Sequence, residues 1–223
     1  MLTNRRRFLN AWLPAAAVLG AAMLMPPSPA GAAERDIKFA FGAPILTLDP
    51  GISGGSQAQT VRFQMMESLV QLNADTGAIE QLLAERWEVA PDGVTWTFHL
   101  RPNVRFHDGS PLTSADVAAS LNRLIDPKSG LPRGNDLRII REIKEVDPLT
   151  IQLVTSTPFG PFLQTIAQDS ASILSKKQIE QSGANIAWNP VGTGPFKYAS
   201  HVPEQSVTLV RNDAYWGPKP EPK

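Results

Sequence analysis

Cysteine is absent from this 223-residue sequence. Its absence excludes structural disulfides, thiolate metal sites and cysteine nucleophiles. It also excludes a lipoprotein anchor, because that modification needs a cysteine at the cleavage point. Histidine is scarce as well, and the three histidines show no spacing typical of metal ligands. We therefore expect no bound metal and no cofactor.

An excess of charge of one sign is also lacking, since 21 basic residues balance 21 acidic ones. A nucleic-acid-binding protein would be clearly basic, with clustered lysines and arginines, so nucleic acid is not an expected partner. Catalytic motifs are missing too. No Gly-Lys-Ser/Thr follows Gly51, Gly54 and Gly55, which excludes a P-loop. Ser53 and Ser56 lie outside any Gly-x-Ser-x-Gly motif, so no esterase-type nucleophile is marked. We expect no catalysed reaction.

The apolar run near the N-terminus is too short to span a membrane, which takes about 20 apolar residues. It covers 15 residues, 11–25, and follows three arginines at 5–7. A basic start, a short apolar run and small residues at 30–32 are typical of a signal peptide, here with a twin-arginine-like pattern. We expect residues 1–32 to be this signal, cleaved near Ala32, with a mature start at Ala33. An uncleaved N-terminal anchor is the alternative.

Removal of this segment takes away three arginines and no acidic residue, which leaves 18 basic and 21 acidic residues and a net charge of −3. The remaining 191 residues, 33–223, can bury a sizeable core. We expect an exported, monomeric protein that is free in the periplasm.

Alternating apolar residues indicate strands, and apolar residues three or four apart indicate helices. The alternation is clearest at 94–100, between the turn dipeptides Asp92-Gly93 and Asp108-Gly109. Thr113, with an acid three residues later, marks a helix start. Strands and helices interspersed in this way indicate an α/β or α+β domain. The expected strands are 37–41, 95–100, 104–107 (in a hairpin with 95–100), 139–146, 150–154, 197–198 and 207–210; the expected helices are 57–72, 113–125, 159–167 and 176–181.

Three stretches carry a resemblance to a known family. They are LAERWEVAPDGVTWTFHLRPNVRFHDG at 83–109, continued by SPLTSADVAASLNRLIDP, then NPVGTGPF at 189–196 and RNDAYWGPKP at 211–220. Together they resemble the signatures of the extracellular solute-binding proteins of family 5, the peptide- and nickel-type receptors of ABC importers. The signatures occur in the same order between residues 83 and 220.

The resemblance implies an α/β fold: the N-terminal lobe of a two-lobed periplasmic-binding-protein-like (type II, cluster C) receptor, a mixed sheet with hairpins and flanking helices. We expect 33–223 to be the N-terminal part of the solute-binding domain, truncated before the second lobe. Its expected ligand is a short peptide or a glutathione-like molecule, delivered to an ABC permease in the inner membrane.

Two regions are candidates for ligand contact by the same resemblance. One is the glycine-rich loop after the TLDP segment, where glycines let a backbone approach a ligand closely; an ordinary turn before a helix is the alternative. The other is 133–138, where an arginine could pair with a ligand carboxylate; a solvent-facing arginine is the alternative. The candidate residues are Ile52, Ser53, Gly54, Gly55, Ser56, Arg133, Asn135 and Arg138.

Three other interpretations stay open. A nickel- or haem-chelate receptor of the same family would need histidines or arginines in its cleft. An exported enzyme would need a nucleophile or a set of metal ligands. A non-functional truncated remnant would expose the apolar surface that a second lobe normally covers.

Overall fold

The computed structural model describes residues 37–52, 55–182 and 186–219. The expected signal peptide, its cleavage point and the candidate residues Ser53 and Gly54 lie outside these ranges. The fold below is that of the compact unit Phe39–Lys223. Within the described ranges, no helix has the length and apolar character needed to cross a membrane.

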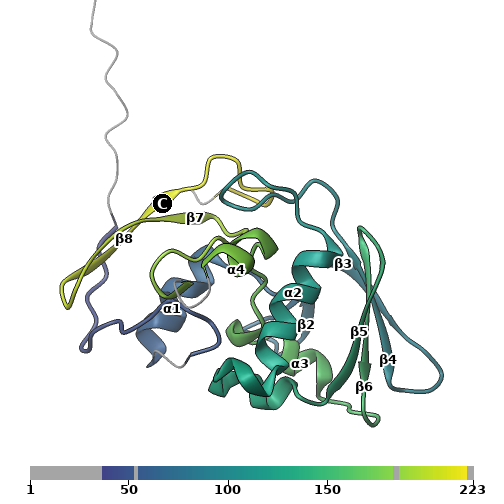
Figure 1. Ribbon diagram of the computed structural model, residues 1–223. Helices are drawn as coiled ribbons and strands as arrows, with labels where there is room; N and C mark the ends of the chain where they lie inside the picture. Colours follow the sequence, from purple (N-terminus) through teal and green to yellow (C-terminus); the bar gives the residue numbers. More distant parts are fainter. Residues whose placement is uncertain (1–36, 53–54, 183–185, 220–223) are drawn as a thin grey trace, which may run out of the picture. The chain divides into compact units, whose positions relative to one another are not determined.

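The centre of the fold is a four-stranded antiparallel sheet with the order β3-β4-β6-β5 (Figure 1). Its strands are β3 (Ala84–Val89), β4 (Thr95–Leu100), β6 (Thr150–Thr155) and β5 (Ile140–Asp147). The outer strand β5 is mostly exposed and rich in charged residues, which protects a free edge from pairing with another chain. The expected strands 95–100, 139–146 and 150–154 are confirmed.

Strand β4 shows why the alternation of its sequence is reliable. Trp96, Phe98 and Leu100 are buried, while the residues between them are partly exposed. The turn before it forms because the side chain of Asp92 accepts hydrogen bonds from the backbone N–H groups of Val94 and Thr95, each at 2.9 Å. Gly93 supplies the positive φ of 68° that this turn requires.

The expected hairpin between 95–100 and 104–107 is wrong. Strand β4 pairs with β3 and β6, and residues 104–107 contribute one isolated bridge, Arg105 to Pro111. Val104 and Phe106 alternate because both point into the core from a loop. The backbone N–H of Phe106 bonds the carbonyl of Ser110, four residues on. Alternation over four residues reports which side chains are buried, and it does not identify a pairing partner.

Helix α2 (Ser114–Ile125) packs against the sheet and is confirmed as expected. Thr113 and Asp116 form the capping box: the Asp116 carboxylate accepts from the backbone N–H of Thr113 at 2.9 Å. The stripe of Val117, Leu121 and Leu124 is buried. The helix ends at Asp126, whose side chain caps the short turn that follows.

The expected helix 57–72 is half right. Helix α1 spans Gly55–Met65, and the chain then forms β1 (Val70–Leu72), which pairs with β2 (Ile79–Gln81). The carbonyl oxygen of Met65 accepts the backbone N–H of Gly194 at 3.0 Å. A distant glycine thus occupies the end of the helix, which spacing within 57–72 could not reveal.

The first expected strand, 37–41, is also wrong. Phe39 and Phe41 are exposed and belong to no strand. A strand requires a neighbouring backbone to pair with, and the described residues supply none for this segment.

Expected helix 159–167 shrinks to five residues, expected helix 176–181 is confirmed, and the two C-terminal strands are longer than expected. The remaining elements are η1 (Pro127–Ser129), η2 (Pro132–Leu137), α3 (Phe162–Ile166), η3 (Asp169–Ala171), α4 (Lys176–Ser182), β7 (Phe196–Val202) and β8 (Ser206–Arg211).

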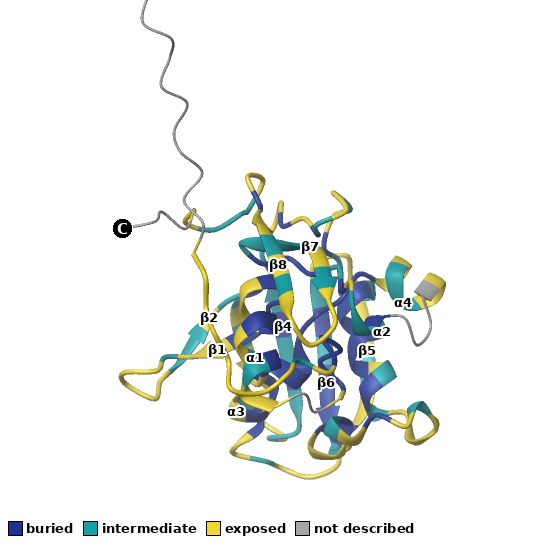
Figure 2. Ribbon diagram, turned by 90° about the vertical axis from the view of Figure 1, so that its left-hand side faces the viewer, coloured by how far each residue is buried: buried dark blue, intermediate teal, exposed yellow. Residues whose placement is uncertain are grey.

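The buried residues, dark blue in Figure 2, form two hydrophobic cores. The larger lies between the four-stranded sheet and helices α2 and α3. The smaller includes Leu48, Val61, Met65 and Leu174, and residues of the β7–β8 hairpin pack against it.

Candidate functional site

The two regions singled out in the sequence lie side by side. The carbonyl oxygen of Gly51 accepts the backbone N–H of Arg133 at 3.2 Å, and the Arg133 guanidinium donates to the carbonyl oxygen of Pro50 at 3.3 Å. The loop before α1 is therefore joined to η2. Ile52 follows this contact directly and is exposed.

A buried carboxylate lies at this junction. Asp169, at the start of η3, accepts a two-pronged pair of hydrogen bonds from Arg133, at 2.8 and 2.7 Å. It also accepts from Arg62 Nε at 2.8 Å and from Gln59 Nε2 at 3.0 Å. Burial alone would raise the pKa of Asp169, but the hydrogen bonds and charges of the two arginines hold it below its ordinary value.

Arg62 is the least expected residue here. It lies on the inner face of α1 with 2% of its surface exposed, and burial lowers its pKa although Asp169 opposes this. Its Nη1 has no hydrogen-bond partner among the described residues. A buried donor left without a partner costs about 1–3 kcal/mol, and more when it is charged. The guanidiniums of Arg62 and Arg133 thus both bind the carboxylate of Asp169, which is shielded from water.

A second ion pair fixes the other side of the loop. The carboxylate of Asp49 accepts from both Nη1 and Nη2 of Arg123, in the last turn of α2. The same carboxylate accepts the backbone N–H of Gly51 at 2.8 Å. We call Asp49, Arg62, Arg123, Arg133 and Asp169 the arginine–aspartate cluster. It anchors the backbone leading to the candidate loop from two directions.

The other candidate residues stand at the surface around this cluster. Gly55, at the start of α1, has a φ of 73°, and Ser56 beside it is exposed. Asn135 and Arg138 are exposed in and after η2. Arg133 differs from the expectation of a free arginine because its fork is already engaged by Asp169. The ligand roles of these residues stay predictions.

Four members of the cluster were not singled out from the sequence. One signal was available: Arg62 occupies the spacing of Ala58, Val61 and Met65, the buried face of α1. A charged residue in an apolar stripe predicts a buried partner of opposite charge. Nothing in the sequence identifies that partner as Asp169, 107 residues away.

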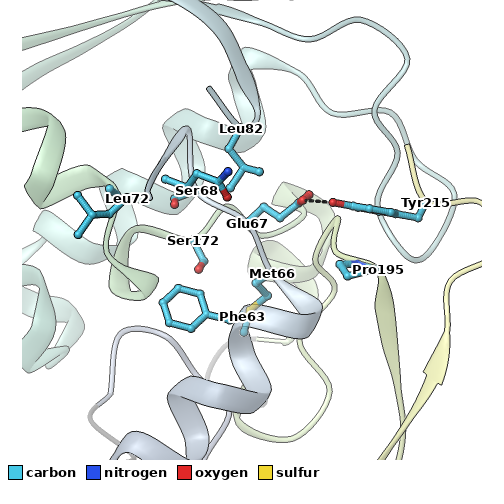
Figure 3. Close-up of a pocket in the computed structure, with 11 residues that line it drawn as sticks. Phe63, Met66, Glu67, Ser68, Leu72, Leu82, Ser172, Pro195 and Tyr215 are labelled. Carbon is cyan, nitrogen blue, oxygen red and sulfur yellow. Dashed lines mark hydrogen bonds between the residues drawn. The ribbon is translucent and has the colours of Figure 1, made fainter. Parts of the chain in front are cut away.

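A second polar centre lies beside a pocket of about 300 Å³ (Figure 3). Glu67 is buried and accepts three hydrogen bonds: from Tyr215 Oη at 2.7 Å, from Trp216 Nε1 at 2.8 Å and from Thr193 Oγ1 at 2.7 Å. Burial raises the pKa of Glu67, and these hydrogen bonds partly oppose the rise. Burial and the nearby carboxylate also raise the pKa of Tyr215. The pocket is lined by Phe63, Met66, Glu67, Ser68, Gln71, Leu72, Leu82, Ala167, Ser172, Pro195 and Tyr215.

The three sequence signatures meet around Glu67. Thr193 belongs to NPVGTGPF, and Tyr215 and Trp216 belong to RNDAYWGPKP. From the first signature, the guanidinium of Arg101 lies 5.3 Å from the ring centre of Trp216. His107, also in that signature, bonds its backbone N–H to Gly192 and its imidazole Nε2 to the Gly194 carbonyl, at 2.9 and 3.0 Å.

These contacts give the signatures a structural role. A buried carboxylate with three donors joins segments almost 150 residues apart, and the glycines allow close backbone approach. A Cβ added at Gly192 would lie 2.2 Å from the Met65 carbonyl oxygen. Burial lowers the pKa of His107 to about 4, so this imidazole is neutral at physiological pH. Among the described residues, no three His, Asp or Glu side chains are grouped as metal ligands.

Curated relatives are similar over almost the whole chain. The glutathione-binding protein GsiB of Pectobacterium atrosepticum is 34% identical over 216 residues, which are 97% of this chain and 40% of that protein. GsiB of Salmonella typhimurium is 33% identical over 205 residues, 92% of this chain and 39% of that protein. The chain thus spans about two fifths of the length of these relatives.

The fold of this chain is also similar to those of solved periplasmic binding proteins. The periplasmic binding protein AgaA from A. tumefaciens R10, in complex with agropinic acid, is 37% identical with a TM-score of 0.73, covering 77% of this chain and 34% of that one. The ABC transporter-associated periplasmic binding protein DppA from Helicobacter pylori, in complex with the peptide STSA, is 31% identical with a TM-score of 0.71, covering 78% and 38%. These matches confirm the expected α/β fold of a periplasmic-binding-protein lobe.

The family itself is shown by the sequence. The profile described as "Bacterial extracellular solute-binding proteins, family 5 Middle" matches residues 78–223. That range is well over half of the chain and contains all three signatures that meet around Glu67. This chain belongs to the bacterial extracellular solute-binding proteins of family 5.

Proposed function

We propose that this chain is the N-terminal part of the substrate-binding component of an ABC importer, and that it binds a short peptide or a glutathione-like molecule in the periplasm. The observation that carries the proposal is the junction of the loop before α1 with η2, in a chain of this family. Relatives named for glutathione binding, and one solved with a peptide, support the ligand class.

The proposed site is the surface around that junction. Ile52, Gly55 and Ser56 are exposed just before or at the start of α1, and Asn135 and Arg138 are exposed in and after η2. Ser53 and Gly54, which lie outside the described residues, are included in the proposed site on the resemblance alone. An extended ligand offers N–H and C=O groups at regular intervals, so backbone groups can bind it with little dependence on its side chains.

The arginine–aspartate cluster gives the proposed surface its rigidity. Ion pairs and backbone hydrogen bonds hold Pro50 and Gly51 against Arg133, so less conformational freedom is lost when a ligand binds. In the complete receptor, ligand binding would shift an open–closed equilibrium, and the closed form would dock on the permease. In keeping with a carrier role, we propose that the protein catalyses no reaction and is monomeric.

The proposed organisation follows from the same role. Residues 1–32 act as a cleaved, twin-arginine-like export signal, and residues 33–223 form the N-terminal part of the solute-binding domain. Contacts from one part of the receptor bind ligand weakly, because a receptor of this family encloses its ligand from two sides.

An NMR titration of the chain with reduced glutathione and with trialanine tests the proposal. We expect saturable, weak binding, with the largest amide shifts at 51–56 and 133–138. A chain with the loop residue Ile52 changed to Asp should lose these shifts, while Val89→Asp, at an exposed position of β3 outside the site, should keep them. Submicromolar affinity of the isolated chain would contradict the idea of weak binding. Absence of shifts with both probes would refute the proposed function.

A further inference from the structure

The pocket beside Glu67 (Figure 3) contains none of the residues of the proposed site. Its volume of about 300 Å³ is roughly that of ten water molecules in the liquid, at about 30 Å³ each. A ligand of about ten non-hydrogen atoms therefore fits. We infer that this pocket binds a small organic cation, an ammonium group carried on an apolar body. The inference concerns a second site and does not depend on the proposed function.

The hydroxyl groups that line the pocket have no hydrogen left for a ligand. Ser68 and Ser172 donate theirs to backbone carbonyl oxygens at 2.8 and 2.7 Å, and Tyr215 donates its own to Glu67 at 2.7 Å. A hydroxyl oxygen that donates its hydrogen still has lone pairs. These three groups can therefore accept hydrogen bonds from a ligand, but they cannot donate to one without giving up a bond inside the protein.

Glu67 adds a negative charge to this set of acceptors. A carboxylate has about four acceptor positions, and Glu67 uses three: one on Oε1, for Tyr215, and two on Oε2, for Thr193 and Trp216. Oε1 thus retains a position for a further donor. Among the described residues that line the pocket, Glu67 alone is charged. Burial raises the pKa of Glu67 because its charge is poorly solvated, and a cation in the pocket would offset that cost.

Two other charged residues lie near the pocket without lining it. Arg101 acts on Glu67 from outside, with its guanidinium 5.3 Å from the ring centre of Trp216 and its Nε donating to a backbone carbonyl oxygen at 2.7 Å. At the exposed edge of the pocket, Gln71 donates to the carboxylate of Glu80 at 3.2 Å. Of the three charges around the pocket, two are therefore negative, and the positive one is already engaged.

The exposed edge of the pocket is apolar. Phe63, on α1, and Leu72, at the end of β1, line it with 52% and 53% of their surfaces exposed. The face of an aromatic ring attracts an ammonium group, and burial of both side chains under an apolar body is favourable. An anion would be repelled by Glu67, and a neutral apolar molecule would leave the free acceptor of Glu67 unpaired. A cation with an apolar body satisfies both parts of the pocket.

The test compares two probes of the same size: phenethylamine, which is a cation at neutral pH, and 2-phenylethanol, in which a neutral hydroxyl replaces the ammonium group. Binding to the full chain is followed by NMR titration. Because hydrogen bonds to charged groups are the stronger ones, we expect phenethylamine to bind about tenfold or more tightly. The shifts should be largest at the amides of Glu67, Ser68 and Ser172 and at the indole N–H of Trp216.

Two variants locate the effect. Glu67→Gln removes the charge and keeps the shape of the side chain, so the advantage of phenethylamine over 2-phenylethanol should fall to about threefold or less. Phe63→Ala removes a half-exposed ring from the edge of the pocket and should weaken phenethylamine binding by about two- to fivefold. Phe39→Ala, which removes an exposed ring outside the pocket, is the matched control and should leave both affinities unchanged.

The charge can also be removed without a substitution, which decides the question if Glu67→Gln fails to fold. The pKa of Glu67 is raised above its ordinary value of 4.5, so more than half of this side chain is protonated at pH 4.5. Between pH 7 and 4.5 the affinity for phenethylamine should therefore fall by about twofold or more, while that for 2-phenylethanol stays constant. Arg101 stays protonated over this range, and Tyr215, whose pKa is raised, stays neutral.

Equal affinity for the two probes, or phenethylamine shifts that lie away from the pocket, would overturn the inference. It also fails if Phe63→Ala and Phe39→Ala bind phenethylamine alike, or if its affinity does not change with pH, because the ring or the charge would then not contact the ligand. In each of these cases the proposed function stands, since its test reads amide shifts at 51–56 and 133–138, and none of these residues lines the pocket.

Discussion

The clearest prediction concerns Glu67, which joins the three signature segments. In Glu67→Ala, the hydroxyl of Thr193, the hydroxyl of Tyr215 and the indole N–H of Trp216 lose their common acceptor. Thr193 is fully buried, so its donor stays unsatisfied. Tyr215 and Trp216 are partly exposed, so water can replace part of what they lose.

These differences set the expected magnitude. An unsatisfied buried donor costs about 1–3 kcal/mol, and the two partly exposed donors cost less. We expect Glu67→Ala to lower the free energy of unfolding by about 2–4 kcal/mol. Glu67→Gln keeps one acceptor oxygen but turns an amide N–H₂ toward a donor, so its effect should be smaller than that of alanine but still measurable.

Urea unfolding at neutral pH, followed by tryptophan fluorescence, measures both variants. Glu142→Gln removes a half-exposed carboxylate from β5 and serves as the control, with an expected change within about 0.5 kcal/mol. If Glu67→Ala cost less than 1 kcal/mol (about the value of one net hydrogen bond), the carboxylate would not join these segments and the reasoning would be wrong.

Three further changes should affect stability in defined ways. His107 has its pKa lowered from 6.5 to about 4, so the stability it contributes is present above pH 6.5 and is lost as the pH falls toward 4, by up to about 3 kcal/mol. In His107→Gln, the urea midpoint should therefore change less with pH between 6.5 and 4 than it does in the wild type. If the midpoints of the two proteins fell equally over this range, the prediction would be contradicted. Gly192→Ala, whose Cβ would clash with the Met65 carbonyl, should cost about 2 kcal/mol or more, whereas Gly160→Ala, with open space around it, should be neutral in the same unfolding assay. Asp169→Asn leaves two arginines without a counter-charge and should lower the unfolding free energy by about 3–5 kcal/mol; a value within error of wild type would show that the cluster is not strongly coupled.

The sequence predicted well those features that depend on neighbouring residues. The alternation in β4 and the capping box of α2 are each complete within a dozen residues, and both were found in the structure. The end of α1 was mispredicted because Gly194, far along the chain, bonds Met65 there. The segment 104–107 was misread for a related reason, since its alternation reflects burial in a loop. Features that depend on long-range contacts can be predicted only in part from the local sequence pattern.

The candidate site shows the same division. The resemblance pointed to the loop before α1 and to Arg133, and the structure brings these together. Their common partner Asp169 has no local pattern that could have identified it. Arg62 did have one, because an arginine on the buried face of an amphipathic helix requires a counter-charge nearby. Only the fold, which brings α1 next to η3, identifies that counter-charge as Asp169.

The signature residues that meet around Glu67 and the residues proposed to contact the ligand are different residues in this chain. The signature residues Thr193, Tyr215 and Trp216 converge on Glu67 and hold distant segments together. Four members of the arginine–aspartate cluster lie outside the signature segments, Arg123 being the exception. The buried contacts around Glu67 can therefore be changed separately from the surface that is proposed to contact the ligand. On this view, Glu67→Gln should lower the urea midpoint and leave the amide shifts caused by reduced glutathione at 51–56 and 133–138 intact.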